Sequence, residues 1–421
     1  MLTNPGSLTR MLVAGLVGAA LGACGQQQDS AEEIGFTELT SPAATGSLGS
    51  HLAVTPDDTV VMSWLEPAAG DTHAVKFSLL RDADWSPPST IATAGNWFVN
   101  SADFPSVVPL TAENWAAHWL VKQPGGTYSY NVALSTSNDG GDNWSAPVTP
   151  HRDNTPTEHG FVTLFPWSGA IGAVWLDGRY TSPDSGGETE PEESHDDEYR
   201  GMTLRFARIG YDGEFLDEGE IDELVCDCCQ TDVAMATGGP IVAYRDRTAG
   251  EIRDISIARH VDGGWTDPVT ISDDQWRIPA CPVNGPAIAA DDKYVAVAWY
   301  GAPNRQGRVK LAWSADGGRT FTAPMLLDDD GVRGRVDVAL LPDHSAAVSW
   351  VAKVGEGTGH LRMRRVTAAG DMGPIELLTE GEYSRSAGFP QMVMAAGRLV
   401  FAWPEPGDAR QVRTAFSRLD D

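Results

Sequence analysis

Four cysteines dominate the chemistry that this sequence could perform. Three of them are crowded into the stretch Cys226-Asp-Cys-Cys229, and Cys281 follows about fifty residues later. Apart from one cysteine near the N-terminus, they are the only thiols in the chain. Thiolates are soft ligands that select ions such as Cu(I) and Zn(II). The spacing therefore predicts a metal site formed by Cys226, Cys228, Cys229 and Cys281.

The N-terminal residues form an export signal that precedes the fold. Arg10 is followed by an apolar run at 11–20, which is too short to span a membrane, and then by Leu21-Gly-Ala-Cys24. This last stretch resembles the bacterial lipobox, which implies a signal peptide at 1–23, lipidation of Cys24 and a polar tether at 24–33. We expect an exported protein that is anchored by its lipid, in the outer membrane facing the periplasm or at the cell surface.

Two other assignments compete with the metal site. An even number of thiols in an exported protein ordinarily favours disulfides, such as Cys226 or Cys228 with Cys281. However, Cys228 and Cys229 are adjacent, and a disulfide between neighbours is strained, so full pairing is awkward. The third assignment is a redox-active disulfide or a reactive thiol.

Composition and charge narrow the class of function. The chain has 45 Gly, 27 Pro and 14 Trp with many Val, Thr and Ile, which is typical of an all-β protein. A net charge of −28 argues against nucleic acid and against electrostatic binding to an anionic membrane. The lipid anchor is therefore the only membrane contact that we expect. The charge is compatible with attracting cations, and it also keeps an exported protein soluble.

A repeated strand pattern supplies the elements that must position the cysteines. Short strands that end in an aromatic residue recur at intervals of 51 to 69 residues, with alternating strands before and after each. Four strands in a unit of about fifty residues is the sequence signature of a β-propeller blade. The seven copies end at Trp64, Trp119, Trp175, Tyr244, Trp299, Trp350 and Trp403.

These repeats predict one all-β propeller domain at 34–421 with seven four-stranded blades. Six blades are the alternative, because the longest interval contains an acidic insertion at 182–200. We interpret this insertion as a solvated loop or as an acidic lid that concentrates cations. The last repeat lacks a fourth strand, and Phe36-Thr-Glu-Leu39 looks like an unpaired one. We expect that strand to close the ring, which removes an exposed strand edge.

The turns between third and fourth strands share a second pattern. Ser137 to Trp144 and Ser314 to Phe321 both read Ser-x-Asp-Gly-Gly-x-x-aromatic. Ser and Asp can bond turn amides, Gly allows positive φ, and the aromatic ring packs beneath. The pattern resembles the Asp-box of bacterial sialidases and related propellers, and as an architecture the resemblance covers nearly the whole mature chain. In those families the box is structural, so it implies a fold and not a chemistry.

Propeller topology predicts that the four sulfurs meet. Connections between blades, and loops from second to third strands, share the face around the central channel. The stretch 226–229 comes just before the first strand of blade four, and Cys281 has the matching position before blade five. Adjacent blades place these connections side by side. The same slot of other blades contains His51, Asp103, Glu158 and His159.

Blade four also resembles the first catalytic blade of sialidases, over residues 243–257. The resemblance implies an acid/base role for Asp254, just before a third strand, with Arg247 among the arginines that would clamp a substrate carboxylate. Tyr383, with a glutamate nearby, could imitate the tyrosine nucleophile of that family. The first arginine of that clamp is missing from this sequence, because Cys229-Gln-Thr231 occupies its position. We expect a sialidase-like fold whose sialidase site is lost.

Two functions follow from these interpretations. The first is a lipid-anchored, non-enzymatic binding protein whose channel face holds Cu(I) or Zn(II), with the metal ion or another extracytoplasmic protein as partner. The alternative is an exo-sialidase-like glycoside hydrolase or a propeller that binds acidic glycans, with structural disulfides and with Trp97 and Trp276 as candidates for stacking on sugars. The sequence contains no Gly-rich phosphate loop, serine-hydrolase elbow or His-Glu-x-x-His motif.

Overall fold

The computed structural model describes residues 36–181, 201–382, 388–407 and 410–418. Several predictions concern residues outside these ranges: the signal peptide and tether, the lipidated Cys24, the acidic insertion at 182–200, and Tyr383. In the described part of the chain, no helix is long and apolar enough to cross a membrane.

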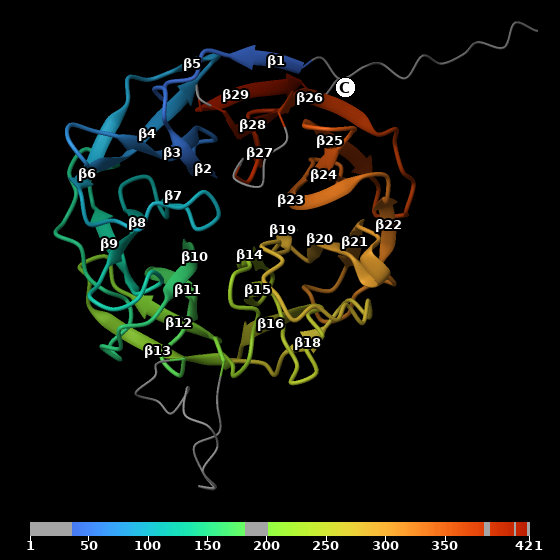
Figure 1. The fold of residues 1–421 in the computed structure, drawn as a ribbon, viewed down its shortest axis with the longest axis horizontal. Coiled ribbons are helices and arrows are strands. Elements are labelled where there is room, and N and C mark those ends of the chain that lie inside the picture. The colour runs from blue at the N-terminus through green and yellow to red at the C-terminus, as the bar shows by residue number, and fades with distance from the viewer. Residues whose placement is uncertain (1–35, 182–200, 383–387, 408–409, 419–421) are drawn as a thin grey trace, which may run out of the picture. The chain divides into compact units, whose positions relative to one another are not determined.

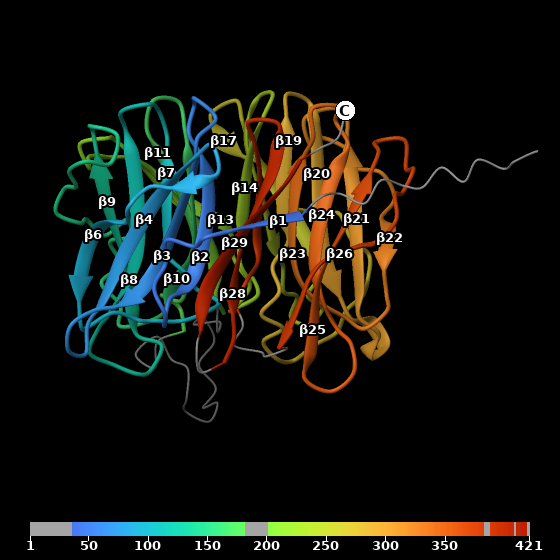
Figure 2. The same cartoon turned by 90° about the horizontal axis from the view of Figure 1, so that it is seen from above.

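Seven antiparallel sheets follow one another around a ring, with the first strand of each nearest the centre (Figure 1). The strands run between the two faces of the ring (Figure 2). The prediction of seven blades is therefore confirmed, and the six-bladed alternative is wrong.

Blades one to three cover residues 48–222. Blade one contains β2 (Leu48–Val54), β3 (Val60–Pro67), β4 (His73–Arg81), β5 (Asp84–Trp85) and β6 (Ser89–Ala94), the last two both paired with β4. Blade two contains β7 (Ser106–Pro109), β8 (Trp115–Lys122) and β9 (Tyr130–Ser137). Blade three contains β10 (His159–Pro166), β11 (Ile171–Asp177), β12 (Thr203–Ile209) and β13 (Phe215–Asp222).

Blades four to seven complete the ring. Blade four contains β14 (Asp232–Ala236), β15 (Gly239–Arg245), β16 (Ile255–Val261), β17 (Gly264–Trp265) and β18 (Val269–Thr270). Blade five contains β19 (Ala287–Asp291), β20 (Tyr294–Gly301), the 3-10 helix η2 (Pro303–Arg305), β21 (Arg308–Ser314) and β22 (Met325–Asp328). Blade six contains β23 (Val332–Leu340), β24 (Ala346–Lys353), β25 (Thr358–Val366) and β26 (Glu376–Glu382). Blade seven contains β27 (Gln391–Ala395), β28 (Arg398–Glu405), β29 (Gln411–Arg418) and β1 (Phe36–Leu39).

The ring closes as the sequence predicts. β1 pairs antiparallel with β29, with Phe36 opposite Ser417 and Leu39 opposite Thr414. This pairing covers the backbone groups of β29 that would otherwise form an exposed edge. The prediction of four strands in every blade is wrong for blade two, where an isolated bridge between Leu134 and Val148 stands in place of the fourth strand. Pro147 and Pro150 have no N–H to donate, so only two consecutive residues between them can donate to a ladder.

The aromatic residues at the ends of the second strands form the core between blades. Four of these indoles, at most 1 % exposed, also donate a hydrogen bond of 2.8–3.0 Å to a carboxylate, which in turn pairs with a basic side chain. This arrangement recurs in four blades as Trp64–Glu66–Lys76, Trp175–Asp177–Arg179, Trp299–Asp274–Lys310 and Trp350–Asp328–Arg362. It is part of the repeat that builds the blades.

The two complete Asp-box turns have the bonding that their sequence predicts. Ser137 Oγ accepts the N–H of Gly141 at 2.9 Å, and Ser314 Oγ accepts that of Gly318 at 2.9 Å. Both of these glycines have positive φ, at 92° and 74°. The turns therefore stabilise the blades from the face opposite to the connections between blades.

Candidate metal centre

The thiol cluster lies on the connection that enters blade four, as predicted. Its backbone is held by two neighbours: Val225 N–H donates to Met202 O at 2.8 Å, and Cys226 N–H donates to Arg245 O at 3.0 Å. The connection that contains Cys281 runs beside it. Gly285 comes so close that a Cβ there would lie 2.0 Å from the carbonyl oxygen of Gln230. Adjacent blades thus bring the two cysteine segments together.

Three of the four predicted ligands form one group. The sulfurs of Cys226, Cys228 and Cys229 all lie within 4.8 Å of one another, and those of Cys226 and Cys229 are 2.7 Å apart. Cys226 and Cys229 are buried, whereas Cys228 is half-buried. Cys281 is exposed and lies outside this group, but its thiol interacts with that of Cys228. All four described cysteines are free thiols.

The cluster favours one buried thiolate. Burial opposes the ionisation of Cys226, but hydrogen bonds from the thiols of Cys228 and Cys229 hold its pKa well below the ordinary value. The nearby charge of Arg245 acts in the same direction. Hydrogen bonding to Cys226 raises the pKa of Cys228, and burial raises the pKa of Cys229 well above its usual range. A thiophilic ion would displace the protons that these two thiols retain.

Two arginines and two carboxylates form a closed network beside the sulfurs. Arg253 Nη1 lies 3.3 Å from Cys226 Sγ and 3.3 Å from Asp227 Oδ2. Arg247 donates to Asp227 Oδ1 at 2.9 Å and to Glu251 Oε1 at 2.6 Å. Arg253 also pairs with Glu251 at 3.0 Å. The network places positive charge next to the thiolate and keeps both guanidinium groups internally paired.

The residues of the sialidase-like alternative have partners within the fold. Asp254 lies directly before β16, as predicted, and its carboxylate accepts the backbone N–H groups of Gln275 at 2.9 Å and Trp276 at 3.1 Å. Burial raises its pKa. Arg247 is paired with two carboxylates, as described above. The proposed sugar-stacking role of Trp97 and Trp276 is wrong, because the two indoles are only 5 % and 6 % exposed.

A tyrosine of blade two and two acids on neighbouring connections lie beside the thiol cluster. Tyr130 Oη lies 2.7 Å from Glu158 Oε1 and 3.1 Å from Asp103 Oδ2. Burial raises the pKa of Asp103 to about 8 and that of Glu158 to about 7. The charge of Asp227 also acts on Glu158, so this group adjoins the thiol cluster. The sequence pattern indicated the two acids and missed Tyr130, which begins a third strand.

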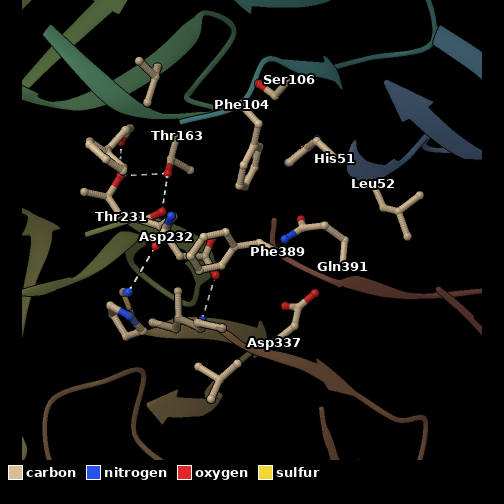
Figure 3. A pocket seen from close by; sticks show the side chains of 18 of the residues that line it. His51, Leu52, Phe104, Ser106, Thr163, Thr231, Asp232, Asp337, Phe389 and Gln391 are labelled. Atoms are coloured by element: carbon tan, nitrogen blue, oxygen red, sulfur yellow. Dashed lines mark hydrogen bonds between the residues drawn. The ribbon is translucent and has the colours of Figure 1, made fainter. Parts of the chain in front are cut away.

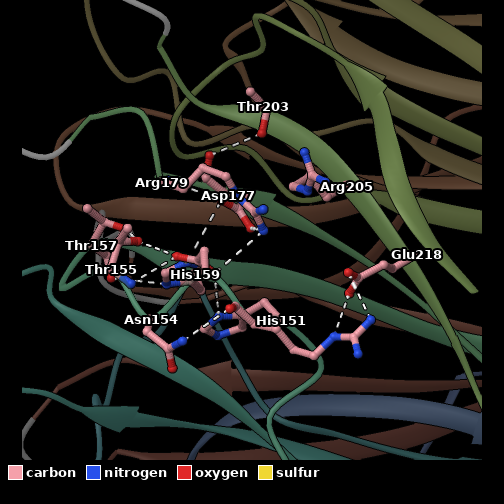
Figure 4. Close-up of polar contacts among 12 residues, drawn as sticks. His151, Asn154, Thr155, Thr157, His159, Asp177, Arg179, Thr203, Arg205 and Glu218 are labelled. Atoms are coloured by element: carbon pink, nitrogen blue, oxygen red, sulfur yellow. Dashed lines mark hydrogen bonds and ion pairs between the residues drawn. The ribbon is translucent and has the colours of Figure 1, made fainter. Parts of the chain in front are cut away.

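A second group of potential ligands lies on the connection from blade two to blade three (Figure 4). One nitrogen of His151, one of His159 and a carboxylate oxygen of Asp153 lie within 4.8 Å of one another. Burial opposes the ionisation of Asp153, but hydrogen bonds from the two histidines hold its pKa well below the usual range. The sequence pattern indicated only His159. The spacing His-x-Asp followed by His could have revealed the group.

The central channel contains a cavity of about 230 Å³, lined by first strands of several blades (Figure 3). His51 lies in its wall, away from the cysteines, and burial lowers its pKa to about 4. The carboxylates of Asp232 and Asp337 also line it, and each accepts a backbone N–H from the first strand of the next blade. Burial raises their pKa values to about 7 and about 8. These acids join neighbouring blades.

Comparisons with known proteins bear on the fold. No protein-family model matches the chain, and no curated protein matches it. The polysaccharide lyase Uly1 is 10% identical with a TM-score of 0.52, over 90% of this chain and 91% of that chain. A protein of unknown function from Dyadobacter fermentans DSM 18053 is 15% identical with a TM-score of 0.48, over 92% and 98% of the two chains. The NanB sialidase from Streptococcus pneumoniae is 8% identical with a TM-score of 0.45, over 91% and 94%.

At these identities the likeness concerns the fold alone, since one propeller architecture supports many unrelated functions. The chain is a seven-bladed β-propeller, and its fold is similar to that of the polysaccharide lyase Uly1.

Proposed function

We propose that this protein binds a thiophilic metal ion, Cu(I) or Zn(II), through Cys226, Cys228 and Cys229 on the channel face of the propeller. The single observation that carries the proposal is the convergence of these three sulfurs within 4.8 Å. Their soft donor character suits these two ions. The role that we assign to the protein is storage or delivery of this ion, as an exported lipoprotein that is anchored through Cys24.

The environment of the sulfurs favours a bound cation. Cys226 is fully buried yet favours the thiolate, and Arg253 alone does not neutralise a site with three thiolates. A metal ion would remove the cost of the remaining buried charge, because it replaces thiol protons with coordinate bonds. Cys228 is half-buried and interacts with the exposed Cys281, which provides a path from the surface to the buried sulfurs.

The distance between Cys226 and Cys229 leaves room for an ion after a small movement. Two thiolates on a tetrahedral zinc ion with bonds of about 2.3 Å are about 3.8 Å apart, whereas a disulfide bond is about 2.05 Å long. The observed 2.7 Å lies between these values. A movement of about 1 Å by the two side chains would bring the sulfurs to the spacing of a metal site.

The structure favours metal binding over the glycosidase alternative. Asp254 uses its carboxylate to hold the loop at 275–276, and Arg247 is paired with Asp227 and Glu251. A substrate carboxylate would have to compete with these internal partners for the guanidinium group. We therefore place no catalytic role on this face.

The test uses the full chain, purified without reductant or chelator. Elemental analysis and thiol titration should find bound copper or zinc and thiols that react only after chelation. Cys228→Ser should abolish Cu(I) binding and the protection of the remaining thiols, while a Cys281→Ser control should keep Cu(I) bound, since Cys281 lies outside the three-sulfur group. A fully reduced protein that takes up neither Cu(I) nor Zn(II) would overturn the proposal.

A further inference from the structure

We propose that His151, Asp153 and His159 form a second metal site, which takes a borderline divalent cation such as Zn²⁺ on the connection between blades two and three. It is separate from the thiol cluster in its residues and in its ligand chemistry. Two imidazole nitrogens and one carboxylate are the donors of zinc sites that keep an open coordination position.

The surroundings of His159 indicate that a cation lies at its Nε2 atom. Nδ1 is 3.3 Å from Tyr130 O and 3.2 Å from Thr157 O, both of which can only accept a hydrogen bond. Nδ1 must therefore carry a proton. On the other side, Nε2 lies 3.1 Å from Asp153 Oδ2 and 3.8 Å from Asp177 Oδ1. A lone pair facing carboxylate oxygens is repulsive, so either a proton or a metal ion must lie between them.

The same hydrogen bonds are those expected of a metal ligand. Metal-binding histidines usually donate their other N–H to a backbone carbonyl or carboxylate, which fixes the tautomer and the direction of the ring. The two carbonyl groups around Nδ1 of His159 do this, and the ring is fully buried. The backbone thus holds Nε2 toward Asp153 before any ion binds.

His151 adds a second, independent observation. Its ring stacks on that of His159 at 3.7 Å between centroids, nearly parallel, and its Nδ1 lies 3.0 Å from Asp153 Oδ1. Its Nε2 atom is buried and has no hydrogen-bond partner among the described residues. The Asp153 contact therefore holds this ring through Nδ1 alone. Two parallel rings cannot both direct a lone pair at one ion, so the His151 ring must turn out of the stack when it binds the ion that His159 and Asp153 hold.

Comparison with the other blades separates this group from the structural repeat. Asp177 and Arg179 belong to the tryptophan–carboxylate–base arrangement that recurs in four blades. His151, Asp153 and His159 are additional to it. In the described part of the chain, the thiol cluster is the one other place where three such ligands come together. Arg179 Nη2 lies 3.5 Å from Asp153 Oδ1, so its charge weakens cation binding and we expect a moderate affinity.

The experiment uses the full chain with all four cysteines at 226, 228, 229 and 281 changed to serine, so that the thiol cluster is removed. Co²⁺ serves as the probe, because its visible absorption reports nitrogen and oxygen coordination and Zn²⁺ displaces it. We expect one equivalent of Co²⁺ to bind, and Asp153→Asn to weaken binding at least tenfold. Asp343→Asn, an aspartate paired with Arg365 in blade six, is the matched control and should leave binding unchanged.

Folding is checked separately, since a buried substitution can act through stability. Circular dichroism of each variant should show the same β content, and His151→Gln, which keeps a polar side chain, gives a second route to the same loss of Co²⁺ binding. No Co²⁺ uptake by the four-serine protein, or uptake that Asp153→Asn and His151→Gln leave unchanged, would overturn the proposal. This outcome is independent of whether the thiol cluster binds Cu(I) or Zn(II).

Discussion

The thiol cluster and the His151–Asp153–His159 group lie on the same face of the propeller and are held in different ways. The three sulfurs contact mainly one another, and among the described residues Arg253 is the one donor to them from another element. His159 is instead oriented by two backbone carbonyls, and both histidines contact the carboxylate of Asp153. The first group must lose protons to bind an ion, whereas in the second group His159 already faces Asp153 and only the His151 ring must turn.

This difference predicts different consequences of mutation. A site whose ligands orient one another should lose nearly all of its metal affinity when one ligand is removed. A site whose ligands are oriented by the backbone should keep partial affinity. The predictions below test this contrast, beginning with the largest expected effect.

The first prediction uses Cys281→Ser to separate the two candidate ions at the thiol cluster. Zinc in structural sites prefers four protein ligands, whereas Cu(I) is satisfied by fewer thiolates. We therefore expect zinc affinity to fall about 100-fold and Cu(I) affinity to change by less than about threefold. Competition titration with a coloured chelator measures both. Equal losses for the two ions would mean that Cys281 is a full ligand and that the site has four sulfurs.

The second prediction concerns the charge beside the thiolate. In Arg253→Gln the hydrogen bond to Cys226 loses its positive charge, so the pKa of this thiol should rise. We expect the ultraviolet absorbance of the thiolate in the metal-free protein to titrate about one pKa unit higher, which is a tenfold change in the ionisation constant. Arg365→Gln in blade six is the control, since that arginine pairs with Asp343 at the surface. An unchanged titration would show that the other sulfurs alone set the ionisation of Cys226.

The third prediction concerns pH and the histidine group. The pKa of Asp153 is depressed in the folded protein, so its ionisation stabilises the fold above the unfolded pKa of about 3.9 and this contribution is lost as the pH falls further. Asp153→Asn should lower the free energy of unfolding by about 1–2 kcal/mol at pH 6, with the difference shrinking below about pH 4. Urea unfolding at several pH values measures it. A difference that is as large at pH 2 as at pH 6 would contradict this assignment.

The smallest effect is expected at Glu158, which lies between the two groups. Burial raises its pKa to about 7, so it is only partly charged at neutral pH. Glu158→Gln keeps an acceptor for Tyr130 and removes little charge. We expect the affinities of both sites to change by less than about twofold, since Glu158 is only partly charged and is a ligand of neither site. A larger change at both sites together would indicate that they are coupled through this residue.

Much of the fold could be predicted from the sequence. The aromatic ends of the second strands recur because each must fill the same space between neighbouring blades, so their spacing reveals the number of blades. The position of β1 followed from the missing strand of the last repeat and the cost of an open edge. Blade two lacks a fourth strand because Pro147 and Pro150 enclose the segment that would pair. The same regularity placed the cysteine segments side by side.

The distances within the sites depended on the tertiary structure. The sequence predicted that Cys226, Cys228, Cys229 and Cys281 lie close together. The loop conformation decided that three of them form a group and that Cys281 stays exposed beside them. Tyr130 was hidden at the start of an ordinary third strand, and the contact of Arg253 with Cys226 depends on the loop before β16. The pairing of His151 with His159 arises from a turn within one connection, which no strand period encodes. Periodicity determines which segments meet because every blade repeats the same packing, whereas the contacts of single side chains depend on irregular backbone that does not repeat.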